Sequence, residues 1–151
     1  MSNIWKGLLA GLAATLVLSA LMVMKATMGV MPELNLPKMI AGMMGSPDTP
    51  MLGWAVHFLI GIVGYGFAIA LMNQRLPGAS PTVHGVFIGV VGWLLMMIVV
   101  MPMAGAGLFG MNMGPMAPMM TLLLHLIFGA VLGWVYGKQL SDASGAVLSR
   151  A

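Results

Sequence analysis

Two histidines occupy the same place in two similar apolar stretches of the sequence. The first stretch reads Trp54-Ala-Val-His57-Phe-Leu-Ile-Gly61, and the second contains His125-Leu-Ile-Phe-Gly129. In each stretch the histidine precedes a glycine by four residues, so on a helix the two lie on one face, one turn apart. Because glycines allow helices in a membrane to approach closely, this pattern predicts that both histidines face the inside of a helical bundle.

A pair of inward histidines could hold a haem. Imidazole is a common axial ligand of haem iron, and the small residues beside His57 and His125 leave space for a macrocycle between two helices. The alternative is structural, since a polar side chain inside a membrane can bond to a neighbouring helix for about 0.6 kcal/mol. We favour the structural interpretation and keep haem b, bound by His57 and His125, as a hypothesis.

A methionine-rich segment supplies a second set of candidate ligands. Thioethers are soft ligands that select Cu(I), and methionines two or three residues apart can present several sulfurs to one ion. The candidate copper ligands are Met111, Met113, Met116, Met119 and Met120. However, the sequence contains 19 methionines, spread over apolar and polar segments alike. That distribution favours methionine as a flexible apolar filler.

The remaining polar residues do not predict catalysis. Cysteine is absent, which excludes disulfides, thiolate metal sites and cysteine nucleophiles. No carboxylate accompanies a histidine in any apolar segment, so a hydrolytic triad is not supported. The glycines fall at helix-packing spacing and do not form a phosphate-binding loop. We therefore expect a protein that is not an enzyme.

The composition predicts an integral membrane protein. Hydrophobic residues make up 60% and charged residues 6% of the chain, and the mean hydropathy is +1.03. Soluble domains are roughly 45–50% apolar and about 25% charged. No charged residue occurs between Arg75 and Lys138, so this part of the chain could not form a soluble surface. The expected surroundings are a lipid bilayer, and the few dispersed basic residues do not indicate nucleic-acid binding.

Four transmembrane spans account for nearly the whole chain as one domain, residues 1–151. A spanning helix needs about 20 apolar residues, and four segments qualify: about 4–24, 52–72, 83–103 and 119–137. Between the first two, Leu36, Met39, Ile40, Met43 and Met44 follow the spacing of one helical face. With Pro37 near its first turn and Gly45 as its cap, this stretch predicts a short interfacial helix. The fold class is therefore all-α.

A repeat relates the two halves. Lys6-Gly7-Leu-Leu-Ala-Gly11 matches His84-Gly85-Val-Phe-Ile-Gly89, and the two histidine stretches match in the same order. We predict two tandem hairpins in the same orientation, related by a pseudo-two-fold axis along the membrane normal. His57 and His125 would then lie at one depth.

Basic residues near the spans predict the orientation. On one side lie Lys6, Arg75, Lys138 and Arg150, and on the other lie Lys25 and Lys38. Because basic residues favour the cytoplasmic side, both termini are predicted to be cytoplasmic.

The chain also resembles a known family. The opening Trp5-Lys6-Gly7-Leu-Leu-Ala-Gly11, the histidine stretch from Trp54 to Gly61 and the run Gly92-Trp93-Leu-Leu-Met-Met are similar to a family of small bacterial four-helix inner-membrane proteins, classified only as a domain of unknown function. The resemblance covers nearly the whole chain. It implies four spans in a bacterial inner membrane, but no reaction and no site residues.

The favoured function is that of an accessory or packing subunit. Segment 104–118 is apolar and uncharged, and exposed apolar patches usually mark contact sites. We expect it to meet a second copy of the chain or a larger membrane complex, although it could also be covered by the first connection or re-enter the bundle. A haem or copper module is the alternative, and a small oligomeric pore or carrier is a further one.

Overall fold

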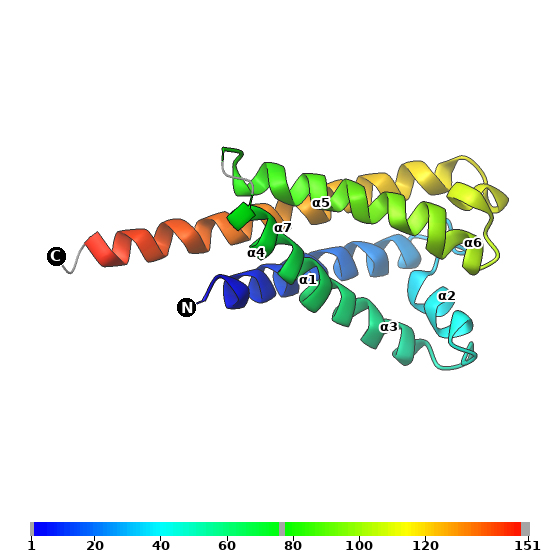
Figure 1. Ribbon diagram of the computed structural model, residues 1–151. Helices are drawn as coiled ribbons and strands as arrows, with labels where there is room; N and C mark the ends of the chain where they lie inside the picture. The colour runs from blue at the N-terminus through cyan, green and yellow to red at the C-terminus, as the bar shows by residue number, and fades with distance from the viewer. Residues whose placement is uncertain (1, 76–77, 149–151) are drawn as a thin grey trace.

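The chain forms a bundle of long helices, shown by a computed structural model that describes residues 2–75 and 78–148, the last five of these by their backbone alone (Figure 1). The first long helix is α1 (Asn3–Thr27), and the second joins α3 (Pro50–Leu59), η1 (Ile60–Gly64) and α4 (Tyr65–Arg75). The third joins α5 (Pro81–Leu95), η2 (Met96–Val100) and α6 (Met101–Met103), and the fourth is α7 (Met116–Leu148). No strand occurs within the described residues. The predicted all-α class is confirmed.

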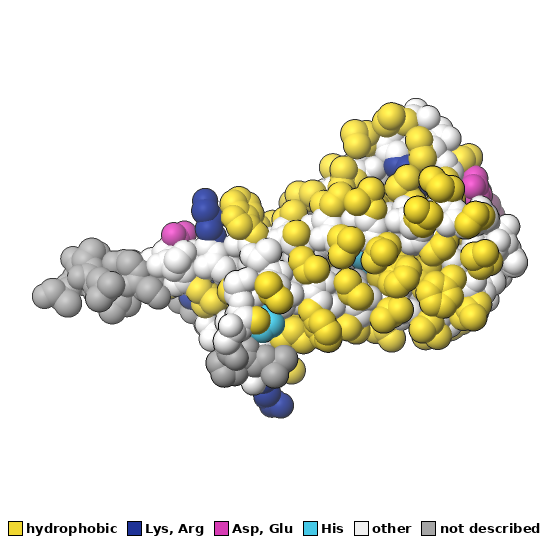
Figure 2. Space-filling model, turned by 90° about the horizontal axis from the view of Figure 1, so that it is seen from above, with side chains coloured by type: hydrophobic (Ala, Val, Ile, Leu, Met, Phe, Trp, Pro, Cys, Tyr) yellow, Lys and Arg dark blue, Asp and Glu magenta, His cyan; other side chains and the backbone are white. Residues whose placement is uncertain are grey.

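All four long helices are long and apolar enough to cross a membrane. They cover the predicted spans and extend beyond most of the predicted ends. Apolar side chains dominate the flank of the molecule in Figure 2, while basic and acidic side chains gather toward its two ends. This distribution is typical of a multi-pass membrane protein, which keeps its charges outside the hydrocarbon layer.

The bundle has two distinct ends (Figure 1). The end that carries the start of α1, the start of α5 and the end of α7 is called the terminal end. The opposite end carries both long connections, 28–49 and 104–115, and is called the connection end. Helices α1 and α5 both run from the terminal end to the connection end.

Short helix α2 (Leu36–Met43) lies in the first connection, where the interfacial helix was predicted. The backbone N–H of Lys38 donates to Oδ1 of Asn35 over 3.1 Å, which caps its start. After its end, Gly45 has a φ of +74°, a conformation that glycine adopts without strain. The Pro37 carbonyl lies directly against Gly53, so α2 is packed on α3.

Glycines bring the helices of each hairpin into backbone contact. A Cβ added to Gly7 would collide with the carbonyl of Gly66, and one added to Gly85 would collide with the carbonyl of Gly129. Small residues at such crossings let helices pack without a hydrophobic driving force, which lipid cannot supply. The glycine stripes therefore mediate packing between helices of the same chain.

The interior contains two clusters of buried apolar side chains. One joins all four long helices and includes Ala10, Ile69, Phe128 and Tyr136. The other, here called the connection-end core, consists of Leu34, Met96, Met97, Met101 and Ala106, with further side chains from both connections packed against it. Part of segment 104–118 is thus buried against side chains of the first connection, through Ala106, while Leu108, Met111 and Met116 of the same segment stay exposed.

Candidate functional site

His57 is buried where α3 passes α1. Its side chain is 7% exposed, and its Nε2 lies 3.2 Å from Oγ of Ser19 on α1. The rings of Trp54 and Phe58 meet the imidazole edge-on, with centroid separations of 5.6 and 5.7 Å. These contacts hold the ring in place, and the hydrogen bond to Ser19 joins α3 to α1.

His125 makes its hydrogen bond within its own helix. Its Nδ1 lies 2.8 Å from the backbone oxygen of Thr121, one turn earlier on α7. A carbonyl oxygen can only accept, so Nδ1 carries the proton in this bond. In the neutral ring, Nε2 then presents a lone pair that could accept a hydrogen bond, take a proton or bind a metal.

The two histidines have separate hydrogen-bond partners. His57 bonds to Ser19 and His125 to Thr121. A cavity of about 30 Å³ beside His125 has room for about one water molecule. A haem would require the helices to separate, and its binding by His57 and His125 stays a prediction.

Thr121 lies at the centre of the polar contacts beside His125. Its side chain is buried, and its Oγ1 lies 2.7 Å from the carbonyl of Ala117. Nε1 of Trp93 donates to this hydroxyl and to the carbonyl of Pro118, both over 3.2 Å. Because Trp93 belongs to α5, these bonds hold the start of α7 against the third span.

A π-helical turn lies near each of the two histidines. In η1 the N–H of Tyr65 donates to the carbonyl of Ile60, and in η2 the N–H of Met101 donates to that of Met96. The first turn begins three residues after His57, and Met96 lines the small cavity beside His125. Such turns often occur at functional sites because they re-aim the neighbouring side chains.

The sequence repeat is not matched by a repeat of contacts. Gly11 lies against the carbonyl of Gly61, whereas Gly89, its counterpart in the repeat, lies against the carbonyl of His125. His125 is one helical turn away from Gly129, the counterpart of Gly61. The second hairpin is therefore packed in a register shifted by one turn, and the pseudo-two-fold axis and the equal depth of the histidines stay predictions.

Lys25 makes hydrogen bonds that were not expected when its charge was used to predict the membrane orientation. Its Nζ donates to the carbonyls of Val30, Met31 and Leu34 over 3.0, 2.8 and 2.9 Å. The side chain lines the small cavity and also a larger one of about 450 Å³. A lysine at the end of a span, just before a turn rich in glycine and proline, was the only available signal.

The five candidate copper ligands divide into two groups. Met113 and Met120 pack against the connection-end core, while Met111, Met116 and Met119 are 55%, 55% and 65% exposed. In the described part of the chain, no group of three or more His, Cys, Asp or Glu side chains could hold a metal ion. A copper site would have to be built from thioethers, and it stays a prediction.

The third histidine lies at the terminal end. His84 is 5% exposed, and its Nδ1 lies 3.4 Å from Oδ1 of Asn73 at the end of the second span. The side chain is therefore a buried link between α4 and α5.

Comparison with known proteins supports the resemblance found in the sequence. Residues 1–146 match the model of the family of unknown function DUF6789. No curated protein matches the chain, and no solved structure does. Since the match extends over all four spans, the chain belongs to the family of unknown function DUF6789.

Proposed function

We propose that this protein is a non-enzymatic accessory subunit, which binds a larger membrane-protein complex or a second copy of itself through the connection end. The observation that carries the proposal is a set of exposed methionines at this end, here called the methionine rim. Their side chains are between 38% and 75% exposed: Met28, Met43, Met44, Met51, Met103, Met111, Met116 and Met119.

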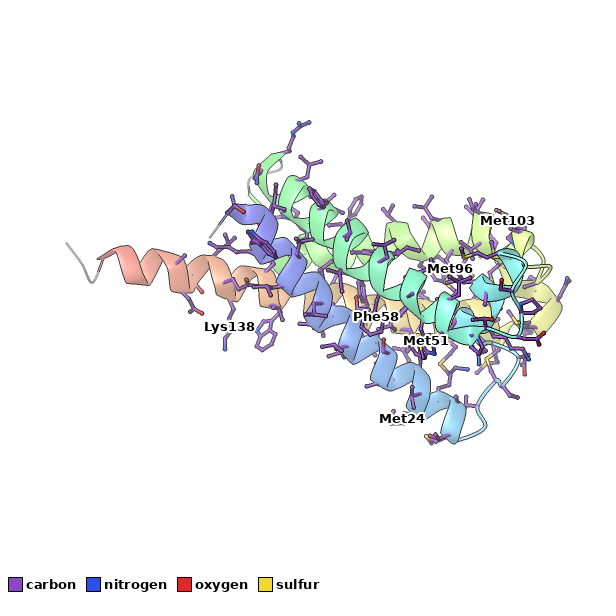
Figure 3. All side chains as sticks on the ribbon, turned by 90° about the horizontal axis from the view of Figure 1, so that it is seen from below. Met24, Met51, Phe58, Met96, Met103 and Lys138 are labelled. Carbon is purple, nitrogen blue, oxygen red and sulfur yellow. The ribbon has the colours of Figure 1, made fainter. Side chains whose placement is uncertain are left out.

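The methionine rim lies in and beside the connections, where helices give way to loops. Figure 3 shows Met51 and Met103 toward this end, far from Lys138 near the terminal end. Leu108, in the uncharged second connection, is 58% exposed. Apolar side chains gathered at one end usually mark a contact surface, and methionine suits such a surface because its flexible chain adapts to a partner.

The region around the two histidines favours packing over transport. His57, His125 and Lys25 all have partners within the chain, and the cavity beside His125 holds about 30 Å³. A pore or carrier would need polar groups along a continuous path. A single chain with so few polar groups in its spans could form such a path only together with further copies. A contact role uses the surface and needs no such path.

The test is to alter the exposed part of the rim in two matched ways. Serine at positions 111, 116 and 119 removes apolar surface, whereas leucine at the same three positions keeps it. We expect the unaltered protein and the leucine variant to migrate above monomer size in blue native electrophoresis of gently solubilised membranes. The serine variant should migrate as a monomer. A monomer-sized band for the unaltered protein would contradict the proposal.

Copper binding is the second candidate, favoured by the exposed thioethers of Met111, Met116 and Met119. The same two variants separate it from packing, because leucine keeps the apolar surface but removes the sulfur that selects Cu(I). If the rim binds copper, metal analysis after exposure to Cu(I) should show a stoichiometric ion in the unaltered protein and none in either variant. Equal copper contents in all three would refute the copper site.

The proposed location is the bacterial inner membrane, with both termini on the cytoplasmic side. Support comes from the basic residues near the spans. Cysteines introduced at Pro47 and Ser80, which lie at opposite ends of the bundle, should be labelled from opposite sides, with position 47 accessible from the periplasm. Labelling of position 80 from the periplasm would reverse the orientation.

A further inference from the structure

A cavity of about 450 Å³ lies at the connection end, between the last turns of α1, the first connection and the start of α3. It exists because the first hairpin opens there: α1 packs against η1 and α4, whereas α3 packs against α2. Its volume falls within the range of about 300–1,000 Å³ that is usual for small-molecule sites. The cavity is therefore large enough to hold part of an amphiphile.

The walls of this cavity are amphipathic. Apolar surface comes from Met22, Val23, Ala26, Leu34 and Trp54, and polar groups come from Lys25, Thr27 and Asn35. Lys25 is the only charged residue among those that line it. The nearby Glu33 acts on the charge of Lys25, but its side chain is exposed and is not part of the lining. The lining thus combines apolar walls with one positive charge.

The polar groups leave distinct roles for a ligand. All three N–H donors of Lys25 are used by backbone carbonyls, so its ammonium group would attract an anion by charge rather than by a new hydrogen bond. Asn35 accepts from the backbone of Lys38 through Oδ1, and its amide N–H groups remain as donors. Trp54 supplies an aromatic ring of the kind found at the level of lipid head groups.

We propose that this cavity binds an anionic phospholipid, with the phosphate near Lys25 and Asn35 and the upper acyl chain along Val23, Ala26 and Trp54. A lipid is the occupant that matches both features of the lining, because its phosphate carries the opposite charge and its chain suits the apolar walls. The site belongs to the first hairpin and does not depend on the methionine rim.

The experiment measures the lipid that the purified protein retains, by native mass spectrometry after incubation with equal amounts of phosphatidylglycerol and phosphatidylcholine of identical chains. A lysine near a membrane surface contributes about 1 kcal/mol of attraction to anionic lipid, which corresponds to about fivefold in affinity. We therefore expect about fivefold more phosphatidylglycerol than phosphatidylcholine on the unaltered protein. Lys25→Gln should abolish this preference, and Lys25→Arg should keep it.

A steric pair of variants keeps the test decisive if Lys25→Gln fails to fold. Ala26→Phe fills the cavity and should reduce retention of both lipids. Ala55→Phe makes the same change at an exposed position of α3 outside the cavity and should leave retention unchanged. Equal retention of the two lipids by the unaltered protein, or equal effects of the two phenylalanines, would overturn the proposal. Displacement of the lipid by free glycerol phosphate would overturn it in favour of a soluble phosphate ligand.

Discussion

Both hairpins pack through glycines at the point where their two helices cross. They differ between that crossing and the connection end. In the second hairpin, Gly85 and Gly89 meet the backbone of α7 at Gly129 and His125, and Trp93 continues the contact to Thr121. In the first hairpin, Gly7 and Gly11 meet the backbone of the second span, but α3 then packs on α2. One hairpin is closed to its end, and the other opens.

The difference shows that the connection, not the crossing, sets the shape of a hairpin. The first connection contains α2. Lys25 donates to three backbone carbonyls of this connection that precede α2, so the connection is fixed between α1 and α3. The opening creates the cavity of about 450 Å³. In this view the second hairpin is the scaffold, and the first carries the proposed lipid site.

Loss of Lys25 should have the largest effect. Lys25→Met leaves the carbonyls of Val30, Met31 and Leu34 without their donor, and hydrogen bonds to a charged group contribute about 1.5–3 kcal/mol. We expect the free energy of unfolding in detergent to fall by about 3 kcal/mol, together with faster hydrogen exchange in residues 28–49.

Lys38→Met is the matched control, because this lysine is exposed in the same connection. It should change neither stability nor exchange. If Lys25→Met leaves hydrogen exchange in residues 28–49 unchanged, the first connection is held by its apolar packing, and the opening of the hairpin has another cause.

The glycine crossings should respond unequally to alanine. Gly129 meets the backbone of Gly85, whereas Gly61, its counterpart in the repeat, meets the side chain of Thr15. The backbone at Gly85 cannot rotate away, so overpacking at Gly129→Ala should cost about 2 kcal/mol. Thr15 is buried and donates to the carbonyl of Gly11, so it can turn away from a new methyl group only by breaking that bond, and Gly61→Ala should cost about 1 kcal/mol. The midpoint of thermal unfolding in detergent measures both.

Gly42→Ala provides the reference for this pair. Nothing lies within 4 Å of the added Cβ, and alanine has the higher helix propensity, so α2 should be unchanged or slightly stabilised. Equal losses at Gly61 and Gly129 would show that the two crossings are equally rigid.

The sequence predicts the fold well because lipid imposes simple rules on it. Spans must be long and apolar, and the pattern around Leu36 and Gly45 contains both the face and the cap of α2. The register of the second hairpin could not be predicted, because the repeat aligns Gly61 with Gly129 while the packing slides by one turn. Residues one turn apart lie on the same helical face. The periodicity of the sequence is therefore the same for both registers and cannot distinguish them.

The candidate site was predicted only in its parts. His57 and His125 follow from their pattern, but their separate partners depend on Ser19 of another helix and on a backbone carbonyl. The role of Lys25 depends on how a loop folds back over a helix end, which side-chain types do not determine. The two π turns are likewise invisible to a pattern that assumes a constant helical period.

The smallest effects concern the histidines, which decide whether the two hairpins share a site. His57 bonds across its hairpin, so its replacement by leucine should cost about 0.6 kcal/mol, the average for a hydrogen bond between helices in a membrane. His125 bonds only within its own helix, so its replacement by leucine should cost less. The double variant should lose the sum within about 0.5 kcal/mol, as separate sites do. The cycle should be measured well above pH 6.5, the approximate ordinary pKa of imidazole, so that charge repulsion between the rings is removed. A coupling above about 1 kcal/mol would show that the rings meet through a shared ligand, and the joint site that their pattern first suggested would then be restored.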